Sequence, residues 1–193
     1  MREPGYTLVE LAFVMALIVT VSAVAIPGIT TTLDDARAIG ATRYLSSRLQ
    51  HARMAAVARS ADVALKFVES GGTFSYTTYV DGNGNGVRTP DIDRGIDRVL
   101  HPAERLPDFF YGVNFGVRPA LPPVDSGGSP PGSDPIKLGI ANILTFTPIG
   151  TSSSGSLYVL GRSGAQYVIR IFGESGKTRV LRFDARAHRW RPL

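Results

Sequence analysis

Residues 8–26 read LVELAFVMALIVTVSAVAI, and this stretch decides the N-terminal part of the fold. Glu10 is its only strongly polar side chain, and Thr20 and Ser22 are mild interruptions. A run of about 20 apolar residues is long enough to cross a bilayer as an α-helix. The stretch therefore predicts a membrane-spanning helix close to the N-terminus.

A secretory signal peptide is the alternative interpretation of this stretch. The charged start, residues 1–5 (MREPG), is very short and contains an acid. The apolar run is longer than the roughly 7–15 residues of a signal-peptide core. The best small-residue cleavage site, Val21-Ser22-Ala23, is followed by more helix-compatible sequence. We therefore expect the helix to be retained in the mature protein.

A second helical segment follows the apolar stretch. Pro27 removes a backbone donor, so we expect a kink or local melting near residues 23–27. The helix is expected to resume after residues 28–32, with Asp34 and Asp35 in its first turn, where the helix dipole favours acids. Further along, helical spacing predicts an amphipathic helix that packs on a sheet through Leu45, Leu49, Ala52 and Ala56.

From residue 61 onward the pattern changes to short β-type runs broken by Gly, Pro and Ser. The connections are mostly too short for helical crossovers, which favours antiparallel pairing. One helix followed by consecutive strands predicts an α+β fold, with a long N-terminal helix packed on a C-terminal antiparallel β-sheet domain. The expected strands are residues 62–68, 74–80, 111–117, 143–148, 156–160, 167–172 and 179–183.

Composition indicates one folded domain. The chain has 193 residues, of which 44% are apolar and 19% charged, as expected of a globular protein rather than a disordered one. It has no cysteine, which excludes a disulfide framework and a thiolate metal site without fixing the compartment. The net charge of +5 permits anionic partners such as nucleic acid or lipid head groups.

The segment Gly5-Tyr6-Thr7-Leu8-Val9-Glu10-Leu11, followed by the apolar helix and Pro27, resembles the class III signal of type IV pilins and type II secretion pseudopilins. The resemblance implies that a prepilin peptidase cuts after Gly5 and that Tyr6 becomes an N-methylated terminus, although Phe is usual there. It also implies that Glu10 is an assembly residue. A buried pair of Glu10 with the terminal ammonium of a neighbouring subunit is tolerated where a lone charge is not.

Later segments resemble one branch of this family, the H-type pseudopilins and FimT-like minor pilins. The similar segments are residues 44–56 (YLSSRLQHARMAA), residues 144–151 (LTFTPIGT) with residues 157–159, and the two β-runs around residues 173–176. The resemblance implies a pilin-like fold with four parts: a leader peptide (residues 1–5), a transmembrane filament-core helix (6–27), its amphipathic continuation (28–60) and a periplasmic β-rich domain (61–193).

Two segments lack a regular pattern. Residues 119–135 are rich in Pro, Gly and Ser and indicate an exposed loop. Residues 81–93 resemble the first half of an EF-hand loop, with Asp81, Asn83, Asn85 and Gly86 at positions one, three, five and six. Position twelve is Ile92 instead of an acid, so a tight loop after a strand is favoured over a calcium site, and we expect no metal or cofactor.

The C-terminal segment, residues 177–193, is strongly basic. Arginines bind phosphate as bidentate donors, and an exposed Trp190 could stack on a base. FimT-like minor pilins, which the chain resembles, include DNA receptors with arginines near the C-terminus. The alternative is a strand with exposed arginines followed by a solvated tail. The candidate DNA-binding residues are Arg179, Arg182, Arg186, Arg189 and Arg191.

Catalysis is not predicted. The chain lacks cysteine, and its three histidines do not show metal-ligand spacing. Residues 161–165 (GRSGA) superficially resemble an esterase elbow but lack its spacing and lie between expected strands. We therefore expect a protein that is not an enzyme and has no catalytic residues.

Two functions follow from the resemblance. The first is a type II secretion pseudopilin at or near the pseudopilus tip that supports assembly and protein export. The second is a minor type IV pilin that binds DNA for uptake. Both imply a single-pass protein of the bacterial inner membrane with a periplasmic C-terminal domain. The implied partners are other pilins or pseudopilins in a hetero-oligomeric filament, the prepilin peptidase and the inner-membrane assembly platform.

Overall fold

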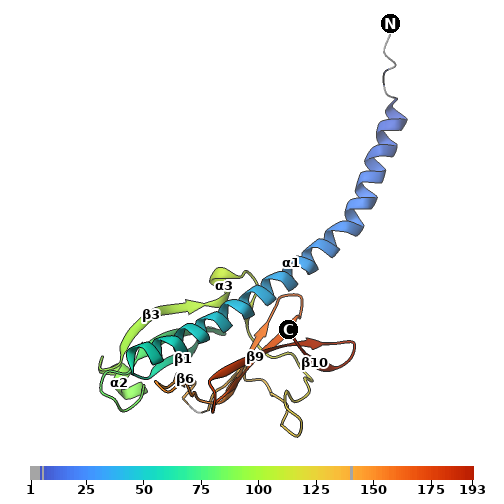
Figure 1. Cartoon of the computed structure of the whole chain (residues 1–193). Coiled ribbons are helices and arrows are strands. Elements are labelled where there is room, and N and C mark those ends of the chain that lie inside the picture. The colour runs from blue at the N-terminus through green and yellow to red at the C-terminus, as the bar shows by residue number, and fades with distance from the viewer. Residues whose placement is uncertain (1–4, 6, 140) are drawn as a thin grey trace.

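The computed structural model describes Gly5, residues 7–139 and residues 141–193, with the backbone alone for residues 24–27. Figure 1 shows one long helix whose N-terminal part projects away from a two-sheet domain and whose C-terminal part lies along it. The predicted α+β class, with a long N-terminal helix and antiparallel sheets, is confirmed.

Helix α1 (Leu8–Arg59) is a single helix of 52 residues. The Thr7 side chain caps its start by accepting a hydrogen bond from the Glu10 N–H, and Ser60 ends it in the left-handed conformation. Of the expected kink or local melting near residues 23–27, the melting is wrong, because the backbone stays helical from residue 23 to residue 33. The helix curves instead where it leaves the domain (Figure 1).

Asp34 and Asp35 therefore lie within a helix, and their expected place in a first turn is wrong. Their carboxylates have side-chain partners instead of helix-terminal N–H groups. Asp34 pairs with Arg37 at 3.2 Å one turn later. Asp35 pairs with Arg182 of the sheet at 3.0 Å and accepts a hydrogen bond from the Ser163 hydroxyl at 3.1 Å. Asp35 thus fastens the helix to the domain at the point where the helix leaves it.

The domain contains two antiparallel sheets (Figure 1). The first has the order β3 (Arg98–Arg105), β2 (Thr73–Val80), β1 (Val63–Ser70) and β6 (Ile143–Phe146). The second has the order β10 (Arg189–Pro192), β9 (Lys177–Asp184), β8 (Gln166–Phe172), β7 (Gly155–Leu160) and β4 (Asn114–Phe115), and β5 (Ile136–Lys137) also pairs with β7. Two short helices precede and follow β3: α2 (Thr89–Asp93) and α3 (Leu106–Phe109).

The core lies between α1 and both sheets. One face of the helix is buried at helical spacing, and the predicted contacts of Leu45, Leu49, Ala52 and Ala56 with the sheet are confirmed. In the first sheet, Phe67 lies opposite Tyr76 in the β1–β2 register. Phe115 of β4 meets the Phe67 ring edge-on at 5.6 Å between centroids, which joins the two sheets.

Six of the seven expected strands coincide with observed strands to within a few residues. The seventh, at residues 111–117, is reduced to β4, because Gly112 turns the chain with a φ of 76° just before it. Strands β3, β5 and β10 were not predicted. Residues 119–135 form no helix or strand, as expected, but Leu121 is buried, so the segment is anchored to the domain.

Candidate functional site

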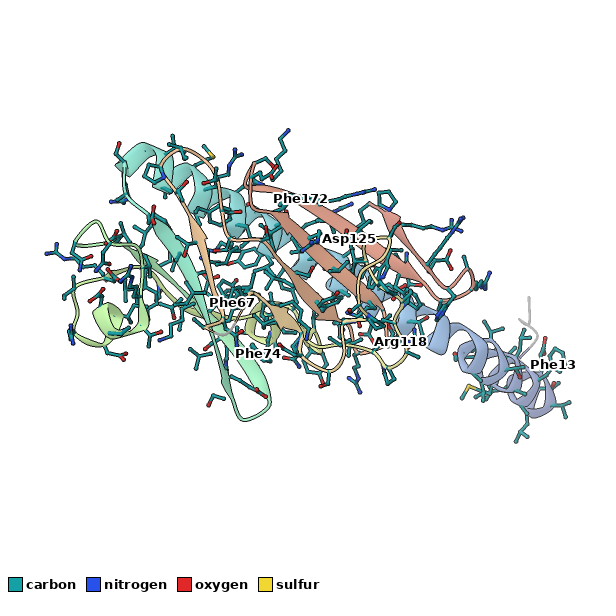
Figure 2. All side chains as sticks on the ribbon, turned by 90° about the horizontal axis from the view of Figure 1, so that it is seen from below. Phe13, Phe67, Phe74, Arg118, Asp125 and Phe172 are labelled. Carbon is teal, nitrogen blue, oxygen red and sulfur yellow. The ribbon has the colours of Figure 1, made fainter. Side chains whose placement is uncertain are left out.

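The N-terminal part of α1 exposes a continuous apolar surface. Leu8 is 83% exposed and Phe13 is 71% exposed, and no part of the 18-residue apolar window of this helix is buried. Figure 2 shows Phe13 far from the sheets, on the projecting helix. Its length and composition are sufficient to cross a membrane, a test that an N-terminal signal sequence also passes.

The residues of the expected processing and assembly motif lie at the start of this helix. Gly5 is exposed, and no atom lies within 4 Å of the place that a Cβ atom would occupy there. Tyr6 lies outside the described residues. Glu10 is exposed in the first turn of α1. It therefore lies on the same projecting segment as the exposed apolar side chains.

Three of the five candidate arginines are brought together at one end of the second sheet. Arg182, Arg186 and Arg191 line an open depression of about 550 Å³. A fourth arginine, Arg118, lines the same depression, and two acids also border it, Asp35 and Asp184. Four guanidinium groups around one depression form an anion-binding surface, since each presents several N–H donors in a planar fork.

Ion pairs hold two of these arginines in place. Arg182 contacts Asp35 at 3.0 Å, and Arg191 contacts Asp184 at 2.8 Å. The N–H of Ala187 bonds to Asp184 and holds the pKa of that carboxyl below its ordinary value, with smaller help from the Arg186 N–H and the Arg191 charge. Asp184 is therefore ionised at neutral pH and keeps the β9–β10 turn, which carries Arg186, folded against the sheet.

Arg118 was not among the candidates, because it precedes the basic segment by 59 residues. The buried side chain of Gln166 on β8 positions it. The Gln166 oxygen accepts the Arg118 N–H at 2.9 Å, and its amide nitrogen donates to the carbonyls of Gly116 and Val159. Figure 2 shows Arg118 at the end of the domain from which α1 projects.

Arg179 and Arg189 do not line this depression. Arg179 lies opposite Arg170 in the β8–β9 register and is three residues from Arg182, so the two arginines on β9 point to opposite faces of the sheet. Arg189 borders a smaller depression of about 350 Å³ beside residues 122–127. The structure therefore brings three of the five candidate arginines to this depression and places Arg179 and Arg189 outside it.

Trp190 is half-buried against the domain instead of being an exposed aromatic, whereas its neighbours Arg189 and Arg191 are exposed to solvent. Its indole N–H donates to the Pro122 carbonyl at 3.0 Å, and its ring lies 5.4 Å from that of Phe183 and 6.2 Å from that of Tyr158. Strand β10 forms because this side chain has apolar partners on β7 and β9, which the local sequence does not reveal.

In the EF-hand-like loop, residues 81–93, side-chain oxygen atoms accept hydrogen bonds from backbone N–H groups of the same loop. Asp81 accepts hydrogen bonds from the N–H groups of Asn83, Gly84 and Gly86. Burial opposes ionisation of Asp81, but these N–H groups outweigh it and hold its pKa below the ordinary value. Among the described residues, no three His, Asp or Glu side chains gather in a way that could hold a metal ion.

The esterase-like segment lies in the turn between β7 and β8. Its Ser163 hydroxyl donates to Asp35 on α1 at 3.1 Å, so it fastens the turn to the helix. The strand-to-helix geometry of a nucleophile elbow is not present at this turn, because strands flank it on both sides.

The chain matches no protein-family model, no curated protein and no solved structure.

Proposed function

We propose that the protein is a membrane-anchored, pilin-like subunit that joins a periplasmic filament through the N-terminal part of α1. One observation carries the proposal: the apolar half of this helix is fully exposed, while the same helix continues without interruption into the core of the domain. Such a surface is unfavourable in water by about 25 cal/mol for each Å². It therefore requires lipid, or the helices of neighbouring subunits, around it.

Glu10 supports an assembly role rather than a purely anchoring one. A carboxylate within a membrane span costs about 2.5–3.5 kcal/mol on insertion scales, so a simple anchor has no use for it. If the chain is cut after Gly5, as its motif suggests, Tyr6 carries a terminal ammonium. The exposed Glu10 of a neighbouring subunit can pair with that ammonium and fix the register of the two helices.

The filament we favour is the pseudopilus of a type II secretion system, with the subunit at or near its tip. The partners are then other pseudopilins, the prepilin peptidase and the inner-membrane assembly platform. In this arrangement the domain remains in the periplasm and α1 moves from lipid into the filament core. The helical continuity between the two parts of α1 would transmit that movement to the domain.

Cysteine cross-linking in cells that carry the assembly machinery tests the proposal. The chain has no cysteine of its own, so Phe13→Cys introduces a single reactive site on the exposed helix. We expect cross-links from this position to the helices of other subunits. Val68→Cys, at an exposed position on β1, is the matched control and should give few. Equal cross-linking at both positions would remove the filament proposal.

A second candidate function is capture of nucleic acid by a minor type IV pilin. The observation that favours it is the meeting of Arg118, Arg182, Arg186 and Arg191 at one depression. Binding of DNA to the full chain in neutral detergent should then weaken as salt rises. Replacing Arg182, Arg186 and Arg191 by Gln should abolish it, whereas replacing Arg179 and Arg189, which lie elsewhere, should not. Absence of binding at low salt would eliminate this candidate.

A further inference from the structure

The arginine-lined depression lies at the end of the domain nearest the projecting helix. Asp35 of α1 lines it, and Ala38, one turn later, is the first fully buried residue among the described side chains of that helix. An α-helix rises 1.5 Å per residue, so residue 35 is about 12 Å beyond residue 27, where the expected membrane span ends. Figures 1 and 2 agree that this end of the domain faces the projecting helix.

A second depression, of about 320 Å³, lies against the same part of α1. It is lined by Thr30, Leu33, Asp34, Arg37 and Arg162. Arg37 and Arg162 each place their guanidinium group 5.7 Å from the centre of the Tyr111 ring. Cation–π contacts of this kind hold the two guanidinium groups on the surface, and Arg37 also pairs with Asp34.

Together the two depressions concentrate positive charge at one end of the molecule. Six arginines and three aspartates line them, a surplus of three positive charges in a chain whose total is +5. For Arg186, no ion pair is found among the described residues. We call the set of Arg37, Arg118, Arg162, Arg182, Arg186 and Arg191 the proximal arginine ring.

We propose that the proximal arginine ring binds the head groups of anionic phospholipids while α1 is in the bilayer. The proposal rests on the membrane anchoring proposed above. The head-group layer extends roughly 5–7 Å beyond the hydrocarbon on each side. With the span ending at residue 27, residue 35, which lines the larger depression, lies within one Debye length, about 8 Å, of the head-group surface. Guanidinium groups bind phosphate oxygens as paired donors, which suits a phosphodiester head group.

The structure favours head groups over nucleic acid as the partner of this surface. The only tryptophan is packed against Phe183 and Tyr158 and does not line either of the two arginine-lined depressions, so it provides no stacking platform beside them. The arginines also gather at the end of the domain where α1 leaves it instead of forming a long track, because they come from α1, the segment after β4, the turns that follow β7 and β9, and strands β9 and β10. A cluster at the base of a membrane helix matches a layer of separate phosphates.

Head-group binding would also orient the domain. A helix alone fixes neither its tilt nor its rotation in a bilayer, and anchors at the interface set both. Contact of the ring with phosphates would hold this end of the domain against the membrane. Extraction of α1 into a filament would then break these contacts, so anionic lipid would oppose extraction.

Solution NMR of the ¹⁵N-labelled full chain in neutral detergent micelles tests the proposal. Dioctanoyl phosphatidylglycerol is titrated in, and the amide signals of Ser163, Gly164 and Arg186 report on the larger depression. We expect saturable shifts at these amides that weaken as salt rises, and no such shifts with dioctanoyl phosphatidylcholine. A basic residue near an anionic surface contributes roughly fivefold in affinity, so R182Q/R186Q/R191Q should weaken binding on the order of 100-fold.

Two further variants keep the result interpretable. R118Q/R186Q leaves both ion pairs intact and should weaken binding on the order of 25-fold. R59Q/R94Q/R98Q removes the same charge from exposed positions at the end of α1, the end of α2 and the start of β3. Screening should keep its effect below about threefold.

Three outcomes would overturn the proposal. The first is equal amide shifts with both lipids, and the second is an equal loss of lipid affinity in the two triple variants. The third is that single-stranded DNA or inorganic phosphate produces these shifts and the anionic lipid does not. The filament proposal fails separately, if the chain is found in the soluble fraction of cells. That result leaves the micelle titration unaffected, so the two failures are distinguishable.

Discussion

At the scale of single residues, Glu104 on β3 joins the helix to the first sheet. Its carboxylate accepts hydrogen bonds from the Tyr76 hydroxyl at 2.8 Å and the Tyr44 hydroxyl at 3.0 Å, and it pairs with Arg48. Burial, more than any neighbouring charge, raises the pKa of Tyr76 well above its ordinary value, so its hydroxyl remains a donor. Three donors from two elements thus depend on one acceptor.

Replacing Glu104 by Ala should therefore be strongly destabilising. The Glu104 side chain is only 11% exposed in the wild type. Its removal therefore leaves the Arg48 charge and two tyrosine hydroxyls without their acceptor in a mostly buried site. We expect a loss of about 2–4 kcal/mol in the free energy of unfolding, less than for a fully buried pair because Arg48 is partly solvated. Urea unfolding followed by Trp190 fluorescence measures it. Asp108→Asn, at an exposed ion pair, is the control and should change nothing measurable.

Asp62 should give stability an unusual pH dependence. Burial, and then the nearby Asp81 charge, raise the pKa of Asp62 above its ordinary value. A raised carboxyl pKa means that the ionised form destabilises the folded state. That penalty is complete above the folded-state pKa and disappears as the pH falls through the unfolded-state value of about 3.9.

Asp62→Asn should therefore be more stable than the wild type at pH 7 and equal to it near pH 3. Urea midpoints at the two pH values check this. A variant that is less stable at neutral pH would mean that the Asp62 carboxylate makes a favourable contact instead.

At the scale of elements, α1 combines two surfaces that rarely occur in one helix. Its first part exposes apolar side chains and Glu10, and its second part buries Leu45 and Leu49 against the sheets. Apolar length and spacing were sufficient to predict both surfaces from the sequence. Continuity was not predictable, because Pro27 and Gly28 locally favour a break and only the surrounding helical residues override them.

Glu10→Ala should separate anchoring from assembly. The variant removes the only strongly polar side chain of the apolar stretch, so insertion and processing should be unaffected or improved. Loss of the pair with a neighbouring terminal ammonium should lower the Phe13→Cys cross-linking yield about tenfold or more. Glu69→Ala, an exposed acid on β1, is the matched control. An unchanged yield would contradict the register role of Glu10.

The strands show where sequence patterns succeed and fail. Strands such as β8 were predictable because their apolar residues are consecutive and bounded by turn residues. Strand β3 was not, because it is an edge strand that contains Pro102 and has mostly exposed side chains. Strand β10 depends on Trp190, whose partners Tyr158 and Phe183 lie on other strands. Such partners can be identified only after the sheet is assembled.

At the scale of the whole molecule, charge and apolar surface are arranged along one axis. The apolar part of α1 lies at one end, the proximal arginine ring follows it, and α2 lies at the far end (Figure 1). The sequence reveals the apolar part and the basic C-terminal segment. It does not reveal that Arg118 joins Arg182, since that meeting depends on the Gln166 contact. The roles of Gly5 and Tyr6 rest on the motif alone and stay predictions.

The mass of the mature protein tests the central claim most directly. The account predicts that the chain purified from bacterial membranes lacks residues 1–5 and begins with an N-methylated Tyr6, and that Gly5→Ala retains the leader. A membrane-bound chain that keeps residues 1–5, or a soluble chain cut near Ala23 as a secretory signal peptide would be, would contradict a filament subunit anchored by α1.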